Sequence, residues 1–395
     1  MNIQFINRLN MRSSQKLTFT ILLLGFINFC WAQRTAPDYT ALEITSEGLV
    51  TFRIKAPDAE NVIVWGSWNP TERIKMQLQD SLWVATIGPL EANAYEYEYL
   101  IDGVSALDPN SKMVTRDGAW IMNMLMVPGA GSEVYQAQNV PHGTVQTVWY
   151  NSPTLETTRR MNIYLPPGYE NNTNRYPVLY LLHGGGGDEE CWLSRGRTNF
   201  ILDNLIASGQ AQPMIVVMPN GNPNTSAAPL SRGITESEQA GIGSMASGRF
   251  EESLVSDIVP FVEANFRALQ GAEHRALSGF SMGGFQTQNI SNAHPEMFQY
   301  LGVMSMGLFS AFNAQTGGNY DRDAHIRQLQ ALKSAGPKLY WIGMGNKDFL
   351  FQTGVKLREL YDEVGLTYEY LENEGTHDWN SWRLYLTTLV PKFFK

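Results

Sequence analysis

The sequence predicts a mostly parallel, doubly wound α/β sheet preceded by a small antiparallel β-sandwich of the immunoglobulin-like early-set type. Three observations lead to this fold class. Short strand-like segments with turn residues between them fill residues 40 to 128, and from about residue 145 apolar strands alternate with helical patterns. Within the second part, a Gly-x-Ser-x-Gly motif at 279–283 lies between a strand-like run and a helix-like run.

The first region is predicted to be the sandwich. Its strand-like segments include Leu49–Ile54, Val62–Trp65 and Trp83–Ile87. The segment Tyr95–Ile101 alternates aromatic and acidic residues, which is typical of a strand with one buried face. We place the sandwich at 33–128, a polar and glycine-bearing linker at 129–144, and the α/β domain at 145–395.

The second region is predicted to alternate strands with helices. The strand Met214–Met218 precedes a long stretch, 222–248, that is rich in Gly, Ser and Asn, and we expect this stretch to be a loop over the site. We find no internal repeats. The expected helices are Asn199–Ser208, Phe250–Leu269, Thr353–Val364 and a final one near Trp379–Phe394.

The first 32 residues have the composition of a secretory signal peptide. Three basic residues precede the apolar run 17–27, and Ala32 supplies a small residue at the expected cleavage site. The apolar run is too short for a stable membrane span. Cys30 raises the alternative of a lipoprotein, but the bulky Phe29 before it argues against lipid attachment. We therefore expect a secreted or periplasmic protein.

Charge and cysteine content exclude several function classes. Removal of residues 1–32 takes away three positive charges and no acidic ones, so the net charge of the chain changes from −9 to −12 over 363 residues. Such a charge repels polyanions and disfavours nucleic acid as a partner. Only Cys191 remains after cleavage, and there is no Cys/His cluster, so we expect no disulfide, no metal and no cofactor.

Ser281 is the predicted nucleophile. A serine can attack a carbonyl carbon only if its hydroxyl stands clear of the backbone, and a sharp strand-to-helix turn achieves this. The turn crowds the residues two before and two after the serine, where Gly279 and Gly283 relieve the crowding. The alternative is a tight glycine turn with no chemical role.

The predicted base is His377. In an α/β hydrolase the chain order is Ser, acid, His, and only three histidines follow Ser281. His294 lies too close behind the turn, and His325 lies in a polar stretch that resembles the start of a surface helix. His377 follows the strand-like segment Thr367–Leu371, at the sheet edge where the base belongs.

The predicted acid is Asp348, which would orient His377 and stabilise its charged form. It follows the buried strand Lys338–Gly345. The alternatives are Asp362, which lies on a predicted helix, and Asp378, which is next to the base itself.

A second glycine-rich loop is predicted to help form an oxyanion hole. The strand Pro177–Leu182 ends in His183 and four glycines, and backbone N–H groups there can stabilise negative charge on a carbonyl oxygen. We expect one donor from Gly185 and the other from Met282. A phosphate-binding loop is the alternative, but no Gly-Lys-Ser/Thr follows. His183 is expected to pack and bond locally.

At these motifs the chain resembles the esterase-D-like α/β hydrolases, especially the feruloyl and acetyl-xylan esterases of carbohydrate esterase family one. The sandwich resembles the glycogen-binding-like domain that often precedes such esterases, at Val64–Asn69 and Tyr97–Pro109. The matching catalytic stretches span nearly all of 145–395, and they are Tyr180–Glu189, Pro213–Gly221, Arg275–Gly284, Gly343–Asp348 and Gly375–Trp382.

The resemblance implies a serine esterase that releases hydroxycinnamoyl or acetyl groups from plant xylan, with arabinoxylan or its feruloylated or acetylated oligosaccharides as partner. It carries over Ser281, Asp348 and His377 as the triad. Trp192 and Trp379 are then candidates for substrate contact. Cys191 stands where the resemblance implies a small polar residue before Trp192, so the resemblance does not define this wall of the acyl pocket.

Other functions stay open beside a feruloyl esterase. An acetyl-xylan esterase differs only in the acyl pocket, whose shape the sequence does not reveal. A siderophore esterase of the enterochelin type has a similar two-domain layout, but the negative charge disfavours a ferric catecholate. A non-catalytic glycan-binding protein is a third class. Trp65 and Trp68 are candidates for stacking on sugar rings, and the alternative is that both fill the core of the sandwich.

Overall fold

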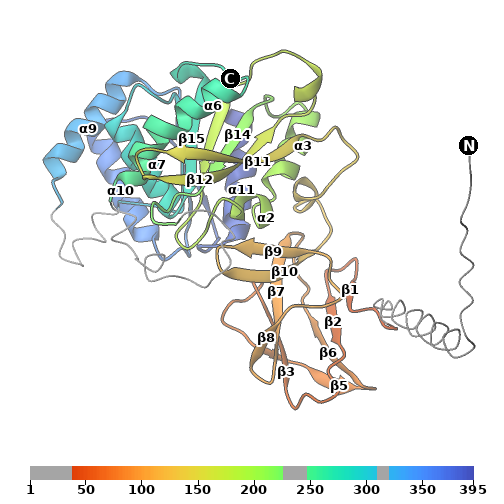
Figure 1. Ribbon diagram of the computed structural model, residues 1–395. Helices are drawn as coiled ribbons and strands as arrows, with labels where there is room; N and C mark the ends of the chain where they lie inside the picture. The colour runs from red at the N-terminus through yellow and green to blue at the C-terminus, as the bar shows by residue number, and fades with distance from the viewer. Residues whose placement is uncertain (1–37, 226–246, 309–319) are drawn as a thin grey trace, which may run out of the picture.

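The computed structural model describes residues 38–225, 247–308 and 320–395. These residues form an antiparallel sandwich followed by a mixed eight-stranded sheet with helices on both faces (Figure 1), which confirms the predicted fold class. The expected signal peptide at 1–32 and most of the loop 222–248 lie outside the described residues. In the described part of the chain, no helix is long and apolar enough to cross a membrane.

The sandwich consists of two sheets. One has the strand order β1-β2-β6-β5, and the other has the order β4-β3-β7-β10-β9 with β8 paired to β7. The strands of both sheets pair with their neighbours in antiparallel orientation. The bounds are β1 Leu42–Ile44, β2 Val50–Ile54, β3 Val62–Gly66, β4 Ile74–Lys75, β5 Gln77–Gln79, β6 Leu82–Ile87, β7 Ala94–Ile101, β8 Val104–Ala106, β9 Val114–Asp117 and β10 Trp120–Met126.

Alternating burial along these strands builds the core of the sandwich. In β2 every second residue is buried, and Phe52 packs against the rings of Tyr97 and Tyr99 from β7. The alternation that predicted a one-sided strand at 95–101 holds only in part, because Glu96 is also buried. Glu96 lines a cavity at the contact with the α/β part.

The eight-stranded sheet has the order β11-β12-β14-β13-β15-β16-β17-β18. The pairs β11–β12 and β12–β14 are antiparallel, and all pairs from β14 to β18 are parallel. Parallel strands place their carboxyl ends at one edge, where ligands bind in such folds. The bounds are β11 Thr144–Ser152, β12 Thr157–Leu165, β13 Val178–Leu182, β14 Ile215–Pro219, β15 Arg275–Phe280, β16 Tyr300–Met304, β17 Leu339–Gly345 and β18 Glu369–Asn373.

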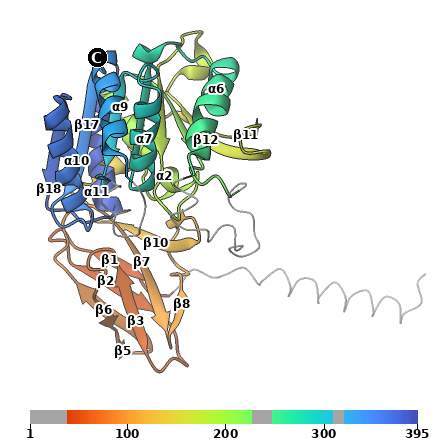
Figure 2. The same ribbon diagram turned by 90° about the vertical axis from the view of Figure 1, so that its left-hand side faces the viewer.

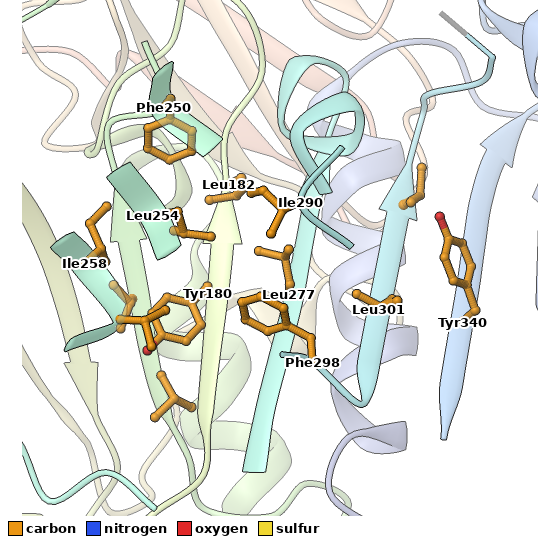
Figure 3. Packing of buried hydrophobic residues seen from close by; sticks show 14 of the residues in the cluster. Tyr180, Leu182, Phe250, Leu254, Ile258, Leu277, Ile290, Phe298, Leu301 and Tyr340 are labelled. Atoms are coloured by element: carbon orange, nitrogen blue, oxygen red, sulfur yellow. The ribbon is translucent and has the colours of Figure 1, made fainter. Parts of the chain in front are cut away.

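Two apolar layers cover the two faces of this sheet. Successive residues of β13 alternate between them: Tyr180 and Leu182 belong to one cluster, and Leu179 and Leu181 to the other. Figure 3 shows the first layer, in which residues of the central strands meet Phe250, Leu254, Ile258 and Ile290 from the helical side. Strands buried on both faces explain the continuous apolar runs of the sequence.

The helices match the expected ones with three differences: the helix expected at 250–269 is divided, it ends at Asn265 where Phe266 turns to an extended backbone, and the last helix is shorter. The expected helix 250–269 is divided into α5 Arg249–Ser253, the π-turn η3 Leu254–Ile258 and α6 Val259–Asn265, because Pro260 has no N–H to donate. The last helix ends at Leu389, and Pro391 follows in a 3-10 turn. The other bounds are α2 Cys191–Ser194, α3 Thr198–Ala207, α7 Met282–Ala293, α9 Arg322–Ala335, α10 Phe351–Val364 and α11 Trp379–Leu389.

The segment 129–144 packs against the α/β part instead of spanning open solvent. Tyr135 is buried in the second apolar layer. Arg197 and Asn204 donate hydrogen bonds to backbone oxygens of this segment, at Tyr135 and Val134. His142 and the backbone of Gly143 both contact the Asp203 carboxylate. These contacts join the two parts of the chain along the connection itself.

Candidate active site

Ser281 lies on the turn between β15 and α7, as predicted. Its backbone has φ 52° and ψ −119°, a strained conformation for a residue with a side chain. The two glycines of the motif fit because side chains there would collide with backbone. A Cβ atom on Gly279 would lie 2.6 Å from the carbonyl carbon of Gly283, and one on Gly283 would lie 2.6 Å from the carbonyl oxygen of Leu182.

The structure brings together the three side chains predicted as a triad. His377 Nε2 lies 3.0 Å from Ser281 Oγ, and His377 Nδ1 lies 2.9 Å and 3.0 Å from the two carboxylate oxygens of Asp348. Each comes from a loop at the carboxyl end of a parallel strand, β15 for the serine, β17 for the aspartate and β18 for the histidine. The hydroxyl, the imidazole and the carboxylate therefore form one continuous hydrogen-bonded chain.

The hydrogen bonds also distinguish Asp348 from Asp362 and Asp378, the other two candidates for the acid of the triad. The Asp348 carboxylate is 4% exposed and accepts a hydrogen bond from the Leu350 N–H, which fixes its orientation. Asp362 is exposed on α10 and accepts from Tyr368 Oη. Asp378 caps α11 by accepting from the Ser381 N–H. Of these three carboxylates, only that of Asp348 is hydrogen-bonded to His377.

His183 braces the glycine loop. Its Nε2 accepts a hydrogen bond of 2.7 Å from the Gly221 N–H, which leaves Nδ1 to donate to the carbonyl oxygen of Gly184 at 2.8 Å. This is the local packing and bonding role expected of it. Gly185, the expected donor, is exposed on the loop beyond Gly184. Met282, the other expected donor, is the first residue of α7, where helix N–H groups have no partner within the helix.

Trp192 is buried behind the site, whereas Trp379, also buried, borders the cavity beside His377, so contact of either with substrate stays a prediction. They are 1% and 2% exposed, and their indole N–H groups donate to Leu182 O and to Asp117 Oδ2. Both pack around Phe280, whose ring stacks on Trp382 at 3.8 Å between centroids. An apolar residue such as Cys191 suits this surrounding, and burial raises the pKa of its thiol.

The two tryptophans of the sandwich differ from each other. Trp68 packs on Phe52 with ring centroids 5.5 Å apart, so it contributes to the core. Trp65 is half-buried, donates its indole N–H to the carbonyl oxygen of Pro70, and carries the Arg73 guanidinium over its ring at 4.3 Å. Arg73 therefore covers one of the two ring faces of Trp65 on which a sugar could stack.

The sandwich contributes charged residues to the site, which the sequence did not indicate. Asp117 at the end of β9 accepts hydrogen bonds from the Trp379 indole at 2.9 Å and from Arg195 at 3.2 Å. Glu96 on β7 is 1% exposed and pairs with Arg383 of α11 at 3.2 Å. Together with Arg195 and the His377 loop, these residues line a cavity of about 180 Å³ between the two parts of the chain.

The buried Glu96–Arg383 pair predicts a stability change. Burial alone would raise the pKa of Glu96, but the guanidinium groups of Arg383 and Arg195 outweigh it and lower the pKa below its ordinary 4.5. Glu96→Gln should lower the free energy of unfolding by about 2–4 kcal/mol, because it leaves buried Arg383 without its counter-charge. Chemical denaturation measures the loss, and Glu98→Gln on the same strand is the control.

The sign of the pH dependence follows from the lowered pKa. A group whose pKa is depressed on folding stabilises the protein above its unfolded value and loses that contribution as the pH falls through the folded value. The stability difference between the parent protein and Glu96→Gln should therefore be largest above pH 4.5 and shrink at lower pH. A difference that grows with acidification would contradict the assignment.

Removal of the sandwich is expected to affect the catalytic part as well. A chain that begins near residue 140 loses Glu96 and Asp117, and it exposes apolar surface now covered by Ala94 and Met124. We expect a melting temperature lower by about 10 °C and reduced turnover even on small esters. Differential scanning calorimetry and a small-ester assay on both chains check this. Unchanged values in both would show that the two parts are independent.

Among the residues that the structure describes, no group of three or more His, Cys, Asp or Glu side chains is arranged to hold a metal ion.

Comparison with known proteins identifies the family. The family model "Esterase", described as "Putative esterase", matches residues 152–393. The chain belongs to this esterase family, and the matched range contains the whole Ser281–His377–Asp348 arrangement.

One relative matches enough of the chain to include most of the sandwich. An "Endo-1,4-beta-xylanase/feruloyl esterase" of Xylanibacter ruminicola is 31% identical over 361 residues, which is 89% of this chain and 46% of the relative. An "Acetyl esterase" of Caldicellulosiruptor saccharolyticus is 23% identical over 53% of this chain and 80% of the relative. The chain spans less than half the length of the two xylanases it matches, at 46% and 12% of their lengths.

Solved structures show the same folds. The carbohydrate esterase family one ferulic acid esterase of Anaeromyces mucronatus aligns with a TM-score of 0.55 and 25% identity, over 66% of this chain and 95% of that one. The enterobactin esterase of Shigella flexneri aligns with a TM-score of 0.64 and 17% identity, over 89% and 94%. At that identity the second likeness shows the fold alone, and it covers both parts of the chain.

Proposed function

We propose that the protein is a secreted serine carboxylic ester hydrolase, and specifically a feruloyl esterase that releases hydroxycinnamic acids from plant arabinoxylan. The observation that carries the proposal is the hydrogen-bonded chain Ser281–His377–Asp348, with 3.0 Å and 2.9 Å between its members. This is the geometry by which a histidine removes the proton of a serine hydroxyl while a carboxylate orients the histidine.

The reaction would proceed through an acyl-enzyme. Ser281 Oγ attacks the ester carbonyl while His377 Nε2 takes the hydroxyl proton, and Asp348 stabilises the charged imidazole. The bond between the carbonyl carbon and the sugar oxygen then breaks, the imidazolium gives its proton to that oxygen, and the sugar leaves as an alcohol while the acyl group stays on Ser281. Water, activated by the same histidine, attacks the acyl-enzyme and releases the acid. The N–H groups of Gly185 and Met282 are our candidates for holding the negative oxygen at each stage.

The choice of a feruloyl group is supported by the relatives. A xylanase joined to a feruloyl esterase matches 89% of this chain, and the aligned Anaeromyces mucronatus structure is a ferulic acid esterase. Secretion or export to the periplasm fits a polymeric plant substrate, and the composition of residues 1–32 supports it. No cofactor or metal is required by this mechanism.

Three other functions are weaker. An acetyl-xylan esterase would use the same triad, and a 23% identical acetyl esterase keeps this alternative open. A siderophore esterase shares the two-part fold, but a net charge of −12 after removal of residues 1–32 disfavours an anionic ferric complex. A glycan-binding protein without activity has no need for a serine, a histidine and a buried carboxylate in hydrogen-bonding contact.

A side-by-side assay tests the acyl group. We expect the purified protein to release ferulate from methyl ferulate and from feruloylated arabinoxylan much faster than it releases acetate from acetylated xylan. Faster acetate release would favour the acetyl-xylan alternative, and hydrolysis of a linear enterobactin-type ester alone would favour the siderophore alternative.

A further inference from the structure

The cavity between the sandwich and the α/β part adjoins the histidine of the triad. In a serine esterase the histidine gives its proton to the leaving oxygen, so the leaving group must lie beside that histidine. His377 itself lines this cavity, together with Asp378 and Trp382 from its own loop and helix. The cavity is therefore placed to receive the alcohol part of the ester.

The opposite wall of the cavity comes from the sandwich. Ser67, Glu96 and Asp117 line it, and Arg195 of the α/β part lies between Glu96 and Asp117. Carboxylates accept hydrogen bonds from hydroxyl groups and a guanidinium donates to them, so this wall suits a polyhydroxylated ligand better than an apolar one.

The hairpin that carries Asp117 also sits on the glycine loop. A Cβ atom on Gly118, in the turn between β9 and β10, would lie 1.9 Å from the carbonyl oxygen of Gly186, so the two backbones are in close contact. Arg116 clamps the same hairpin to Asp188 through two hydrogen bonds of 2.5 Å and 3.1 Å. Figures 1 and 2 both show β10 on the side of the sandwich that meets the α/β part.

This hairpin also exposes a large aromatic side chain on the face that carries Asp117. Trp120 is directly opposite Asp117 across the two-residue turn, and directly opposite residues of an antiparallel pair place their side chains on the same face. Trp120 is therefore on the Asp117 side of the hairpin, and 64% of its surface is exposed. An exposed indole can stack on the apolar C–H face of a sugar ring, and neighbouring polar groups can form hydrogen bonds with the hydroxyls at its edge.

We propose that this cavity, with Trp120 at its rim, is the subsite for the sugar that leaves when the ester is cleaved. The sandwich would then recognise the glycan next to the scissile bond, through Trp120 and Asp117, rather than at a distance through Trp65 or Trp68. The inference rests on the proposed ester hydrolysis, because it takes His377 to be the group that protonates the leaving alcohol.

The test compares two substrates that differ only in the leaving group. Methyl ferulate has no sugar, whereas a feruloylated arabinoxylo-oligosaccharide places arabinose and xylose in the proposed subsite. Trp120→Ala should lower kcat/KM on the oligosaccharide about tenfold, mainly through KM, and leave methyl ferulate within about twofold. Trp120→Phe should recover most of the loss, because a flat ring remains. Trp149→Ala, at a tryptophan that is 56% exposed on β11, should change neither substrate.

The possible failures can be told apart. Unchanged kcat/KM of Trp120→Ala on the oligosaccharide, or an equal loss on both substrates, would overturn the subsite and leave the esterase assignment intact. If the parent protein hydrolyses neither ferulate ester, the proposed function fails, and the subsite fails with it.

Discussion

Replacing Ser281 with alanine is expected to lower ester hydrolysis by roughly 10³-fold or more and to leave the protein folded. The hydroxyl lies 3.0 Å from His377 Nε2, and among the residues that the structure describes it is the hydrogen-bonding partner of that nitrogen. Alanine is smaller than serine and keeps the same backbone, so the strained turn between Gly279 and Gly283 can persist. Initial rates on methyl ferulate, with circular dichroism to check folding, measure the effect.

Ser278 provides the matched control for this change. It lies in β15, three residues before Ser281, and is fully buried, but its hydroxyl has no hydrogen-bond partner among the described residues. Ser278→Ala should retain most of the activity. If Ser281→Ala kept a tenth of the parent turnover, Ser281 would not be the nucleophile.

Asp348→Asn is expected to lower turnover by about 10³–10⁴-fold. The carboxylate holds a proton on His377 Nδ1, which leaves Nε2 free to accept the Ser281 proton. An asparagine amide can donate to Nδ1 instead, which moves the ring proton to Nε2 and removes the base. The side chain has nearly the same shape, so the protein should remain folded. The measurement is kcat on methyl ferulate.

The two rival carboxylates serve as controls. Asp362→Asn should have little effect, because Asp362 is exposed and bonds to Tyr368. Asp378→Asn should cost at most about 1 kcal/mol of stability through a weakened cap of α11. A variant at Asp378 as slow as Asp348→Asn would reassign the acid.

The sequence predicted the triad because each member follows a recognisable strand. Buried parallel strands appear as apolar runs, and the residues at their carboxyl ends meet at one edge of the sheet, so order along the chain was enough to select Ser281, Asp348 and His377. The rival Asp378 could be excluded only by the structure, since its role as a helix cap depends on backbone geometry.

Contacts between distant segments escaped prediction. Glu96 and Arg383 are 287 positions apart, and no local pattern indicates that they pair. Trp192 and Trp379 were expected at the substrate because they adjoin catalytic motifs; the structure packs both around Phe280 and places Trp379 beside the cavity that His377 lines. Asp117 gave no signal, because its partners Trp379 and Arg195 lie beyond the expected domain boundary.

The formation of a covalent acyl intermediate on Ser281 is the defining step of the proposed feruloyl esterase. Its most direct test is stoichiometric labelling with a fluorophosphonate, which reacts with activated serines, followed by peptide mass spectrometry and by assay of ferulate release. We expect the label on Ser281, a fall in ferulate release in proportion to labelling, and far slower labelling of Asp348→Asn. A fully labelled protein that still releases ferulate, or a label on another residue that accompanies inactivation, would contradict this role of Ser281.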